Sequence, residues 1–382
     1  MRGNWNYPTA IRFGAGRIAE LAEACTSLGM SRPLLVTDAG LARLPIVSEA
    51  VAANNAAGLP TGLFSEVRGN PVGANVEAGV TAYRAGGHDG VIAFGGGSAL
   101  DVAKAIALMV GQDRPLWDFE DIGDNYTRVN VAGMAPVVAV PTTAGTGSEV
   151  GRASVITDAS DHTKKIIFHP RMLPALVIAD PALTIGLPAT LTAWTGIDAL
   201  SHCLEAFCAP GFHPQADGTA VEGIRLISRS LERAVADGSD IEARAMMMAA
   251  SSMGATAFQK GLGAMHALAH PVGAVLDAHH GLTNAVFMPY VLTFNRPAIA
   301  ERIGDLARYI GLDQPTFAGF HAWVLGLRER LDIPHTADAL GVTEERIADL
   351  GRRAAADPSA GGNPIPVDAA ALSGLYHQSL RG

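Results

Sequence analysis

Four histidines crowd into one short segment of this 382-residue chain, GAMHALAHPVGAVLDAHHG at residues 263–281. His266 and His270 are four residues apart, so on a helix their side chains lie on one face. His280 lies fourteen residues after His266, which on one unbroken helix would separate them by about 21 Å. Pro271 and Gly281 allow the chain to bend, and we expect a bend to return His280 to the others.

A second pair of candidate ligands lies upstream, in TGIDALSHCLEAF at residues 195–207. Asp198 and His202 are again four apart, a common helical way of offering two ligands to one ion. One carboxylate and three imidazoles suit a divalent first-row metal such as iron, zinc, manganese or cobalt. Any single histidine has an ordinary alternative as a packed or exposed residue. The combination of two such pairs with a third histidine predicts a metal site.

Two glycine-containing turns in the first half of the chain are candidates for binding a nucleotide. GGGSALD at residues 95–101 follows an apolar run and precedes a helical pattern. Its glycines allow close backbone approach, and N–H groups at a helix start favour an anion such as a diphosphate. The alternative is a tight turn without a ligand. FGAGRIAEL at residues 13–21 contains a GxGxxA pattern, but no clear strand precedes it in the sequence.

Polar residues after two other apolar runs extend this candidate site. Asp38 ends the run PLLVTD, where a carboxylate can bind a ribose hydroxyl and favour NAD over NADP. Its alternative is to cap a turn. The segment PTTAGTGSE at residues 141–149 carries hydroxyl groups. These and its N–H groups are able to hold a phosphate, ribose or carboxamide, with turn and cap chemistry as the alternative.

The pattern of apolar residues divides the chain into two halves. Short apolar runs alternate with helical patterns at residues 33–40, 90–110, 135–150 and 175–181. This alternation indicates a parallel sheet covered on both faces. From about residue 186 the patterns become long, helical and rich in Ala, Leu and Met. We expect a Rossmann-like α/β nucleotide-binding domain at residues 1–184 and an all-helical metal-binding and substrate domain at residues 185–382.

Composition excludes several classes of function. The formal net charge is -9 and no long basic run is present, which argues against binding to nucleic acid or to an anionic membrane. The three cysteines are too few and too unevenly spaced for a disulfide framework. The sequence shows no apolar signal segment and no uninterrupted apolar stretch of about 18 residues. We expect a cytoplasmic protein with no membrane partner.

Taken together, the motifs resemble the iron-containing (group III) alcohol dehydrogenase family almost from end to end. FGAGR, VTDAGL, GGGSALD, VPTTAGTGSEV, GIDALSHCLEA, HALAHPVGA and HHGLTNAVFMPYV occur in the family's order. The resemblance implies that a divalent metal lies in a cleft between the two domains, with Fe²⁺ expected and Zn²⁺ as the alternative. It implies that His270 lines the site and passes a proton, and that the metal ligands are Asp198, His202, His266 and His280.

The resemblance also implies the cofactor, the reaction and the assembly. A small primary alcohol or ω-hydroxy acid would be converted to its aldehyde or semialdehyde by hydride transfer to NAD. A homodimer or higher homo-oligomer is implied, and a strand at the sheet edge within NWNYPTAIRFG is able to pair across an interface. The implied cofactor residues are Asp38, Asn70, Gly95, Gly96, Gly97, Ser98, Asp101, Thr142, Thr143, Thr146, Ser148 and Lys164.

Some positions depart from the family pattern. His279 stands where members often have proline, and it adds a second candidate ligand beside His280. Lys260 and Arg152 lie in segments that flank the family's active site. They suggest the hypothesis that one of them selects an anionic substrate, with solvated surface charge as the alternative.

Two other functions share the fold. One is an NAD- and metal-dependent synthase of the dehydroquinate synthase type, which needs a basic phosphate pocket that the sequence does not suggest. The other is a metal-free reductase of the maleylacetate reductase type, against which the complete set of four ligands argues.

Overall fold

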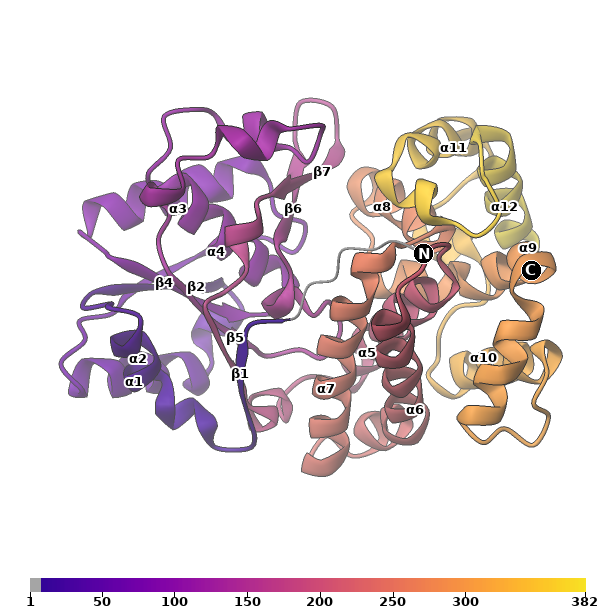
Figure 1. Cartoon of the computed structure of the whole chain (residues 1–382), viewed down its shortest axis with the longest axis horizontal. Coiled ribbons are helices and arrows are strands. Elements are labelled where there is room, and N and C mark those ends of the chain that lie inside the picture. The colour runs from indigo at the N-terminus through magenta and orange to yellow at the C-terminus, as the bar shows by residue number, and fades with distance from the viewer. Residues whose placement is uncertain (1–7) are drawn as a thin grey trace. The chain divides into compact units, whose positions relative to one another are not determined.

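Six parallel strands form the sheet of the first of two units (Figure 1). In the computed structural model, which describes residues 8–382, this unit extends to Thr143 and resumes at Gly147–Gly186. The strand order is β1-β8-β5-β4-β2-β3. The strands are β1 (Ala10–Phe13), β2 (Pro33–Asp38), β3 (Gly62–Val67), β4 (Gly90–Gly95), β5 (Val137–Pro141) and β8 (Leu176–Ala179).

Helices cover both faces of this sheet, which explains why its central strands are apolar without alternation. Leu35, Ile92 and Val138 point from β2, β4 and β5 into a buried cluster with residues of α1 and α2. The helices α3 and α4 pack on the sheet as well, and α4 contacts β2, β4 and β5. The four helices are α1 (Leu21–Ser27), α2 (Pro45–Ala56), α3 (Gly73–Ala85) and α4 (Gly97–Met109).

Three strands lie where the sequence analysis placed none. One is β3, and the other two form an antiparallel hairpin of β6 (Ala153–Asp158) and β7 (Thr163–Phe168). Partly accessible residues interrupt the buried ones along all three, as in GLFSEV of β3 and TKKIIF of β7. Half-buried strands of this kind lack the continuous apolar runs on which the strand predictions relied.

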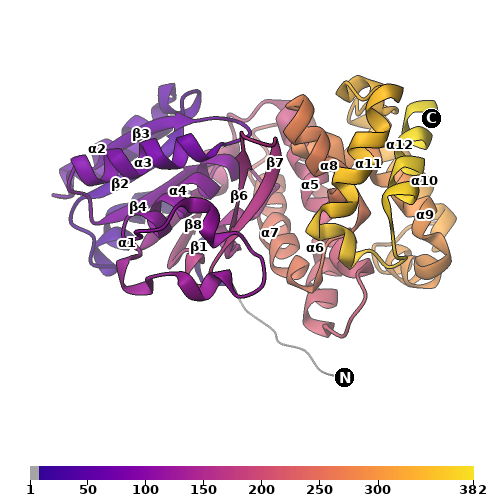
Figure 2. The same cartoon turned by 90° about the horizontal axis from the view of Figure 1, so that it is seen from above.

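The second unit contains helices without a sheet (Figure 2). It comprises Leu187–Gly382 and the short segment Ala144–Thr146. The predicted fold class, a parallel α/β domain followed by a helical one, is confirmed. Its helices are α5 (Ala189–Cys208), α6 (Pro214–Ala236), α7 (Ile241–Ala257), α8 (Ala264–Leu276), α9 (His280–Tyr309), α10 (Phe317–Arg330), α11 (Ile347–Ala356) and α12 (Ala369–Arg381).

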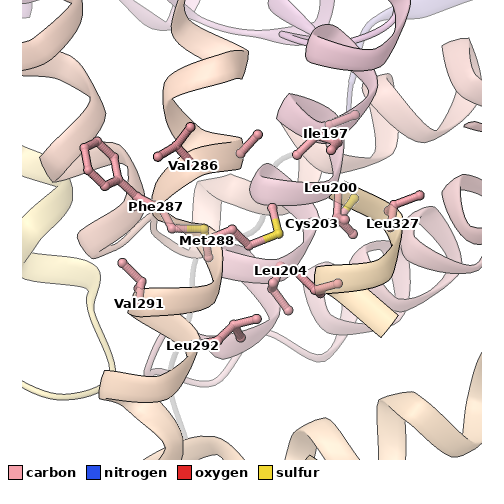
Figure 3. Packing of buried hydrophobic residues seen from close by; sticks show 14 of the residues in the cluster. Ile197, Leu200, Cys203, Leu204, Val286, Phe287, Met288, Val291, Leu292 and Leu327 are labelled. Atoms are coloured by element: carbon pink, nitrogen blue, oxygen red, sulfur yellow. The ribbon is translucent and has the colours of Figure 1, made fainter. Parts of the chain in front are cut away.

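The core of the helical unit is centred on α5 and α9 (Figure 3). Leu200 and Leu204 of α5 share one buried cluster with Met288 and Leu292 of α9. Cys203 belongs to the same cluster, and burial raises the pKa of its thiol to about 12. A thiol in this environment behaves as a small apolar group.

The bend that brings His280 back does not lie at Pro271. Pro271 sits inside α8, which continues to Leu276. The chain turns at Asp277, whose φ of 55° is left-handed, and α9 then begins at His280. Gly281 is in the first turn of α9, where a Cβ atom would lie 2.3 Å from the Trp194 carbonyl oxygen of α5. The glycine therefore allows the close approach of α9 to α5, rather than a turn.

Within residues 8–382, no helix combines the length and the apolar character that crossing a membrane requires.

We predict that Gly281→Ala destabilises the protein by about 1–3 kcal/mol, because the added methyl group meets backbone atoms that cannot move aside. Gly218→Ala in α6 is the matched control, since a Cβ atom there would meet no atom within 4 Å. The control should be neutral or stabilising, because alanine is the better helix former. Thermal unfolding of both variants measures the difference, and equal melting temperatures would contradict the prediction.

Candidate functional site

Three helices bring one carboxylate and three imidazoles together in the helical unit. Asp198 and His202 come from α5, His266 from α8 and His280 from α9. One ligand atom from each lies within 4.8 Å of those of the other three. Asp198, His202 and His266 are at most 5% exposed, whereas the His280 side chain is 25% exposed. Three of the four side chains are thus buried, and that of His280 is partly accessible.

Two of the imidazoles are oriented by hydrogen bonds from their outer nitrogens. His266 Nδ1 lies 2.6 Å from Glu205 Oε2, and His202 Nδ1 lies 3.3 Å from the Gly145 carbonyl oxygen. Because both partners are acceptors, we assign the ring proton to Nδ1 in each case. The Nε2 lone pairs are then available to an ion, which is the arrangement that metal-bound histidines adopt in proteins.

Burial and charge move the pKa values of these two histidines in opposite directions. Burial lowers the pKa of His202 to about 4, so its ring is neutral at physiological pH. Burial also disfavours the charged form of His266. The hydrogen bond and negative charge of Glu205 outweigh that effect and raise the pKa of His266.

The donor set fits a divalent cation. Asn284 of α9 places its Nδ2 3.0 Å from Asp198 Oδ1 and 3.2 Å from both His266 Nε2 and His280 Nε2. An amide carries only two hydrogens, so it cannot satisfy three acceptors at once. Converging lone pairs at a buried position are costly without a positive partner. A cation held by the carboxylate and imidazoles would supply this positive partner. Oxygen and nitrogen donors of this kind suit iron or zinc.

His270 lies against this cluster without belonging to it. Its ring stacks on His280 with centroids 5.3 Å apart, and its Nδ1 lies 2.8 Å from Asp357 Oδ2. Burial alone would raise the pKa of Asp357, but the charge and hydrogen bond of His270 hold that pKa below its ordinary value. An ionised Asp357 accepts a hydrogen bond from the Nδ1–H group of His270. This leaves His270 Nε2 available for proton transfer.

The segment that carries Asp357 is anchored to α8 and α9 by a reciprocal pair of amides. Asn295 Nδ2 donates to Asn363 Oδ1 and Asn363 Nδ2 donates to Asn295 Oδ1, each at 2.8 Å. Asn363 Oδ1 also accepts from the Ala264 N–H, at 3.1 Å, in the first turn of α8. These bonds hold residues 357–363 beside the helix that provides His266 and His270.

The glycine turn of the α/β unit has the form of a phosphate-binding loop. Gly95 ends β4 with a φ of 143°, where an added Cβ would lie 2.8 Å from the Ala99 side chain. The Thr142 N–H donates to the Gly95 carbonyl at 3.0 Å, and a Cβ at Gly96 would lie 3.3 Å from Thr143. Both segments follow the carboxyl ends of neighbouring parallel strands, where such sheets bind nucleotides. This cradle of small residues fits a diphosphate.

Several predicted cofactor residues have partners within the unit. Asp38 Oδ1 accepts from the N–H groups of Gly40 and Leu41, each at 2.9 Å, so it does cap a turn. Asp101 Oδ1 accepts from Ser148 Oγ at 2.5 Å, and its Oδ2 accepts from the Val155 N–H at 2.9 Å. These contacts tie α4 to the segment after β5.

The other predicted cofactor residues lie at several places. Ser98 Oγ donates to the Gly69 carbonyl, which places Asn70 next in the chain to that contact. Lys164 is in β7 opposite Thr157. Thr146 belongs with the helical unit rather than with the α/β unit.

The N-terminal GxGxxA pattern is closed by an internal carboxylate. The strand β1 directly precedes it. It is the edge strand expected within NWNYPTAIRFG, although the glycine pattern by itself had shown no clear strand before it. Asp180 Oδ1 accepts from the Gly16 N–H at 3.1 Å, and Asp180 Oδ2 accepts from the Ile18 N–H at 2.9 Å. The N–H groups that would bind a phosphate are thus occupied by an aspartate.

Comparison with known proteins identifies the family. The family model described as iron-containing alcohol dehydrogenase matches residues 8–181, and that of the C-terminal domain of the same family matches residues 192–380. The chain belongs to the iron-containing alcohol dehydrogenase family. It is 40% identical to the 4-hydroxybutyrate dehydrogenase of Cupriavidus necator, over 98% of this chain and 99% of that protein.

Solved structures agree with this assignment. A 1,3-propanediol oxidoreductase superposes with a TM-score of 0.94 at 34% identity, with full coverage of both chains. The sulfoacetaldehyde reductase of Bifidobacterium kashiwanohense, solved in complex with NAD⁺, gives a TM-score of 0.90 at 30% identity, with 99% of each chain covered. The protein is accordingly an alcohol dehydrogenase, which interconverts an alcohol and its aldehyde with NAD.

Two departures of this dehydrogenase from its family have structural explanations. His279 precedes α9 and accepts from the Leu282 N–H at 3.4 Å, with its ring 5.0 Å from the Trp194 ring. It therefore caps a helix outside the four-donor cluster. Lys260 is only 2% exposed at its side chain and forms a 2.6 Å ion pair with Asp217. This pairing argues against Lys260 as a cation for substrates. Arg152 lies 5.6 Å from the Phe168 ring centroid.

Three residues of the site were missed in the sequence. Glu205 follows Asp198 and His202 on the same face of α5, and Asn284 follows His280 by one helical turn. Helical spacing would have found both. Asp357 is 87 residues from His270, and no spacing rule connects them.

We predict that Glu205→Gln weakens metal binding by about 10- to 100-fold, because the neutral amide no longer fixes the Nδ1 proton of His266. Glutamine retains an oxygen that can accept from the Met265 N–H, as Glu205 does at 2.7 Å. Competition with a chelator measures the affinity, and circular dichroism verifies folding. An unchanged affinity would show that Glu205 does not orient His266.

A second prediction concerns Asp357. Replacement by asparagine should lower kcat by about 10- to 100-fold, at or below the lower end of the contribution of general acid–base groups, because Asp357 acts only through His270. KM and metal content should change little, because Asp357 contacts no candidate ligand atom directly. Asp357 Oδ1 also caps the following helical turn by accepting from the Ser359 N–H, at 2.8 Å. Asp368→Asn is the matched control for this role, since Asp368 caps a helix by accepting from the Ala371 N–H, also at 2.8 Å. If both variants retain wild-type kcat, His270 does not depend on Asp357.

Proposed function

We propose that Asp198, His202, His266 and His280 hold one divalent ion, with Fe²⁺ favoured and Zn²⁺ as the alternative. The observation that carries this proposal is the convergence of their ligand atoms within 4.8 Å. The family description supports iron, although O and N donors of this kind accept both metals. A bound divalent ion supplies Lewis-acid chemistry and lowers the pKa of an alcohol hydroxyl.

The protein's own residues then handle the proton and the orientation of the cofactor. We propose that His270, held by Asp357, takes up the proton released in alcohol oxidation and returns it in aldehyde reduction. The hydride chemistry belongs to NAD. Asp198, His202 and His266 are buried, and the resulting exclusion of water would strengthen the electrostatic effect of a bound ion.

For NAD, we propose that Gly95, Gly96, Gly97 and Ser98 cradle the diphosphate. Asp38 would accept from the adenosine ribose through the oxygen that does not cap the turn, and would disfavour NADP. Asn70 would lie near that ribose. The remaining residues proposed around the cofactor are Asp101, Thr142, Thr143, Thr146, Ser148 and Lys164, of which Asp101 and Ser148 would act by holding the loops in place.

For the substrate, we propose a small primary alcohol or an ω-hydroxy acid. The relative that is a 4-hydroxybutyrate dehydrogenase supports the acid. If an arginine or lysine selects the carboxylate, Arg152 remains the candidate, since the Lys260 side chain is buried and already paired with Asp217.

The alternatives are disfavoured by specific observations. A synthase of the dehydroquinate synthase type does not account for the matches to both domain models of the dehydrogenase family. A metal-free reductase does not account for four convergent ligand groups, two of them imidazoles oriented by outer hydrogen bonds.

We also propose a cytoplasmic homodimer or higher homo-oligomer, with nucleotide-binding and metal-binding domains at residues 1–184 and 185–382. The strand β1 is at the edge of the sheet, and Ile11 and Phe13 are 36% and 42% exposed there. Unpaired edge strands with apolar side chains favour pairing with another chain. The first residues of the segment NWNYPTAIRFG lie outside the described residues. Three free cysteines suit a reducing compartment.

The test is elemental analysis of anaerobically purified protein, combined with NADH assays on alcohols and ω-hydroxy acids before and after chelation. We expect about one divalent ion per chain, loss of activity on its removal, and recovery with a single metal. Matched pairs such as 4-hydroxybutyrate and 1-butanol distinguish anionic from neutral substrates. Activity that survives complete metal removal would contradict the proposal and favour the metal-free reductase.

A further inference from the structure

Asn284 occupies a position that the reaction described above does not explain. It is fully buried on α9, one helical turn after His280. Its Nδ2 lies within hydrogen-bond distance of Asp198 Oδ1, His266 Nε2 and His280 Nε2, at 3.0, 3.2 and 3.2 Å. One neutral donor thus reaches three of the four atoms proposed to hold the ion.

The acceptors determine how this amide is oriented. The Nδ1 proton of His266 points to Glu205, so the neutral ring, the form able to bind a metal, presents a lone pair at Nε2, and Asp198 presents a carboxylate oxygen. An amide oxygen turned toward these groups would be repelled, whereas the N–H groups are attracted. Among residues 8–382, Asn284 Oδ1 is a buried atom without a hydrogen-bond partner. The amide is therefore held through its nitrogen.

We propose that the Asn284 amide competes with the metal for the same lone pairs and thereby keeps the bound ion exchangeable. This inference rests on the proposed metal site. When an ion takes the Nε2 lone pairs of His266 and His280, the amide can no longer donate to them and retains only Asp198 Oδ1. The amide therefore forms more hydrogen bonds in the metal-free protein than in the metal-loaded protein, and it stabilises the metal-free protein more.

By thermodynamic linkage, this difference fixes the direction in which metal affinity changes when the amide is removed. Removing the amide must cost the metal-free protein more than the metal-loaded protein, so metal affinity must rise. Loss of about one net hydrogen bond corresponds to roughly a two- to ten-fold change in the dissociation constant. If Asn284 were a metal ligand, or only supported the loaded site, its replacement would lower the metal affinity instead.

The experiment uses Asn284→Leu in the full-length protein, with Asn284→Ala as a second variant in case the larger side chain prevents folding. Co²⁺ is the probe, because its visible absorption reports the ligand set as well as binding. Asn295→Leu is the matched control. Asn295 is also a buried asparagine of α9, but its amide pairs with Asn363 instead of the candidate ligands.

We expect Co²⁺ to bind the Asn284 variants about two- to ten-fold more tightly than the wild type, with a similar spectrum and with slower loss to a chelator. The Asn295 variant should be less stable but unchanged in affinity. Weaker binding with an altered spectrum would overturn the inference and make Asn284 a ligand. Unchanged affinity would overturn it as well. A wild-type protein that binds no Co²⁺ would instead overturn the proposed metal site itself.

Discussion

The enzyme buries one carboxylate and three imidazoles whose ligand atoms converge on one point. Several features of the helical unit stabilise this cluster. Groups of this kind repel one another unless each is oriented and a positive partner is supplied. Glu205 and the Gly145 carbonyl turn two rings so that their lone pairs converge. Gly281 removes the side chain that would keep α9 away from α5. The missing side chain at Gly281 and the two hydrogen bonds to the outer ring nitrogens thus set the positions of the four candidate ligands.

The sequence was informative where chemistry and helical spacing coincide. Asp198 and His202 lie on one helical face, as do His266 and His270, and such pairs are visible without a structure. The position of His280 was harder to predict, because it depends on the turn at Asp277 and on Gly281. Proline suggested the wrong position for the bend, since Pro271 is accommodated within α8. Asp357 was beyond prediction, because only the fold brings it to His270.

The α/β unit shows a different limit of sequence motifs. Two segments have glycine spacing suited to a phosphate, yet their N–H groups are not equally available. At Gly16 and Ile18 they are bound by the buried carboxylate of Asp180, whereas Gly95 and Gly96 lie beside Thr142 and Thr143, which follow β5. A glycine pattern records the backbone conformation of a turn. Whether a ligand or an internal side chain fills that turn depends on a residue far away in the sequence.

The order of the functional groups along the chain has a consequence for biosynthesis. The four candidate ligands belong to α5, α8 and α9, whereas the partner of His270 belongs to the segment after α11. A chain emerging from the ribosome therefore exposes every candidate ligand before Asp357 has been translated. Reciprocal amides at Asn295 and Asn363 then fasten the late segment onto helices already made. Capture of the ion can begin on the nascent chain, while competence for proton transfer is acquired only when synthesis is nearly finished.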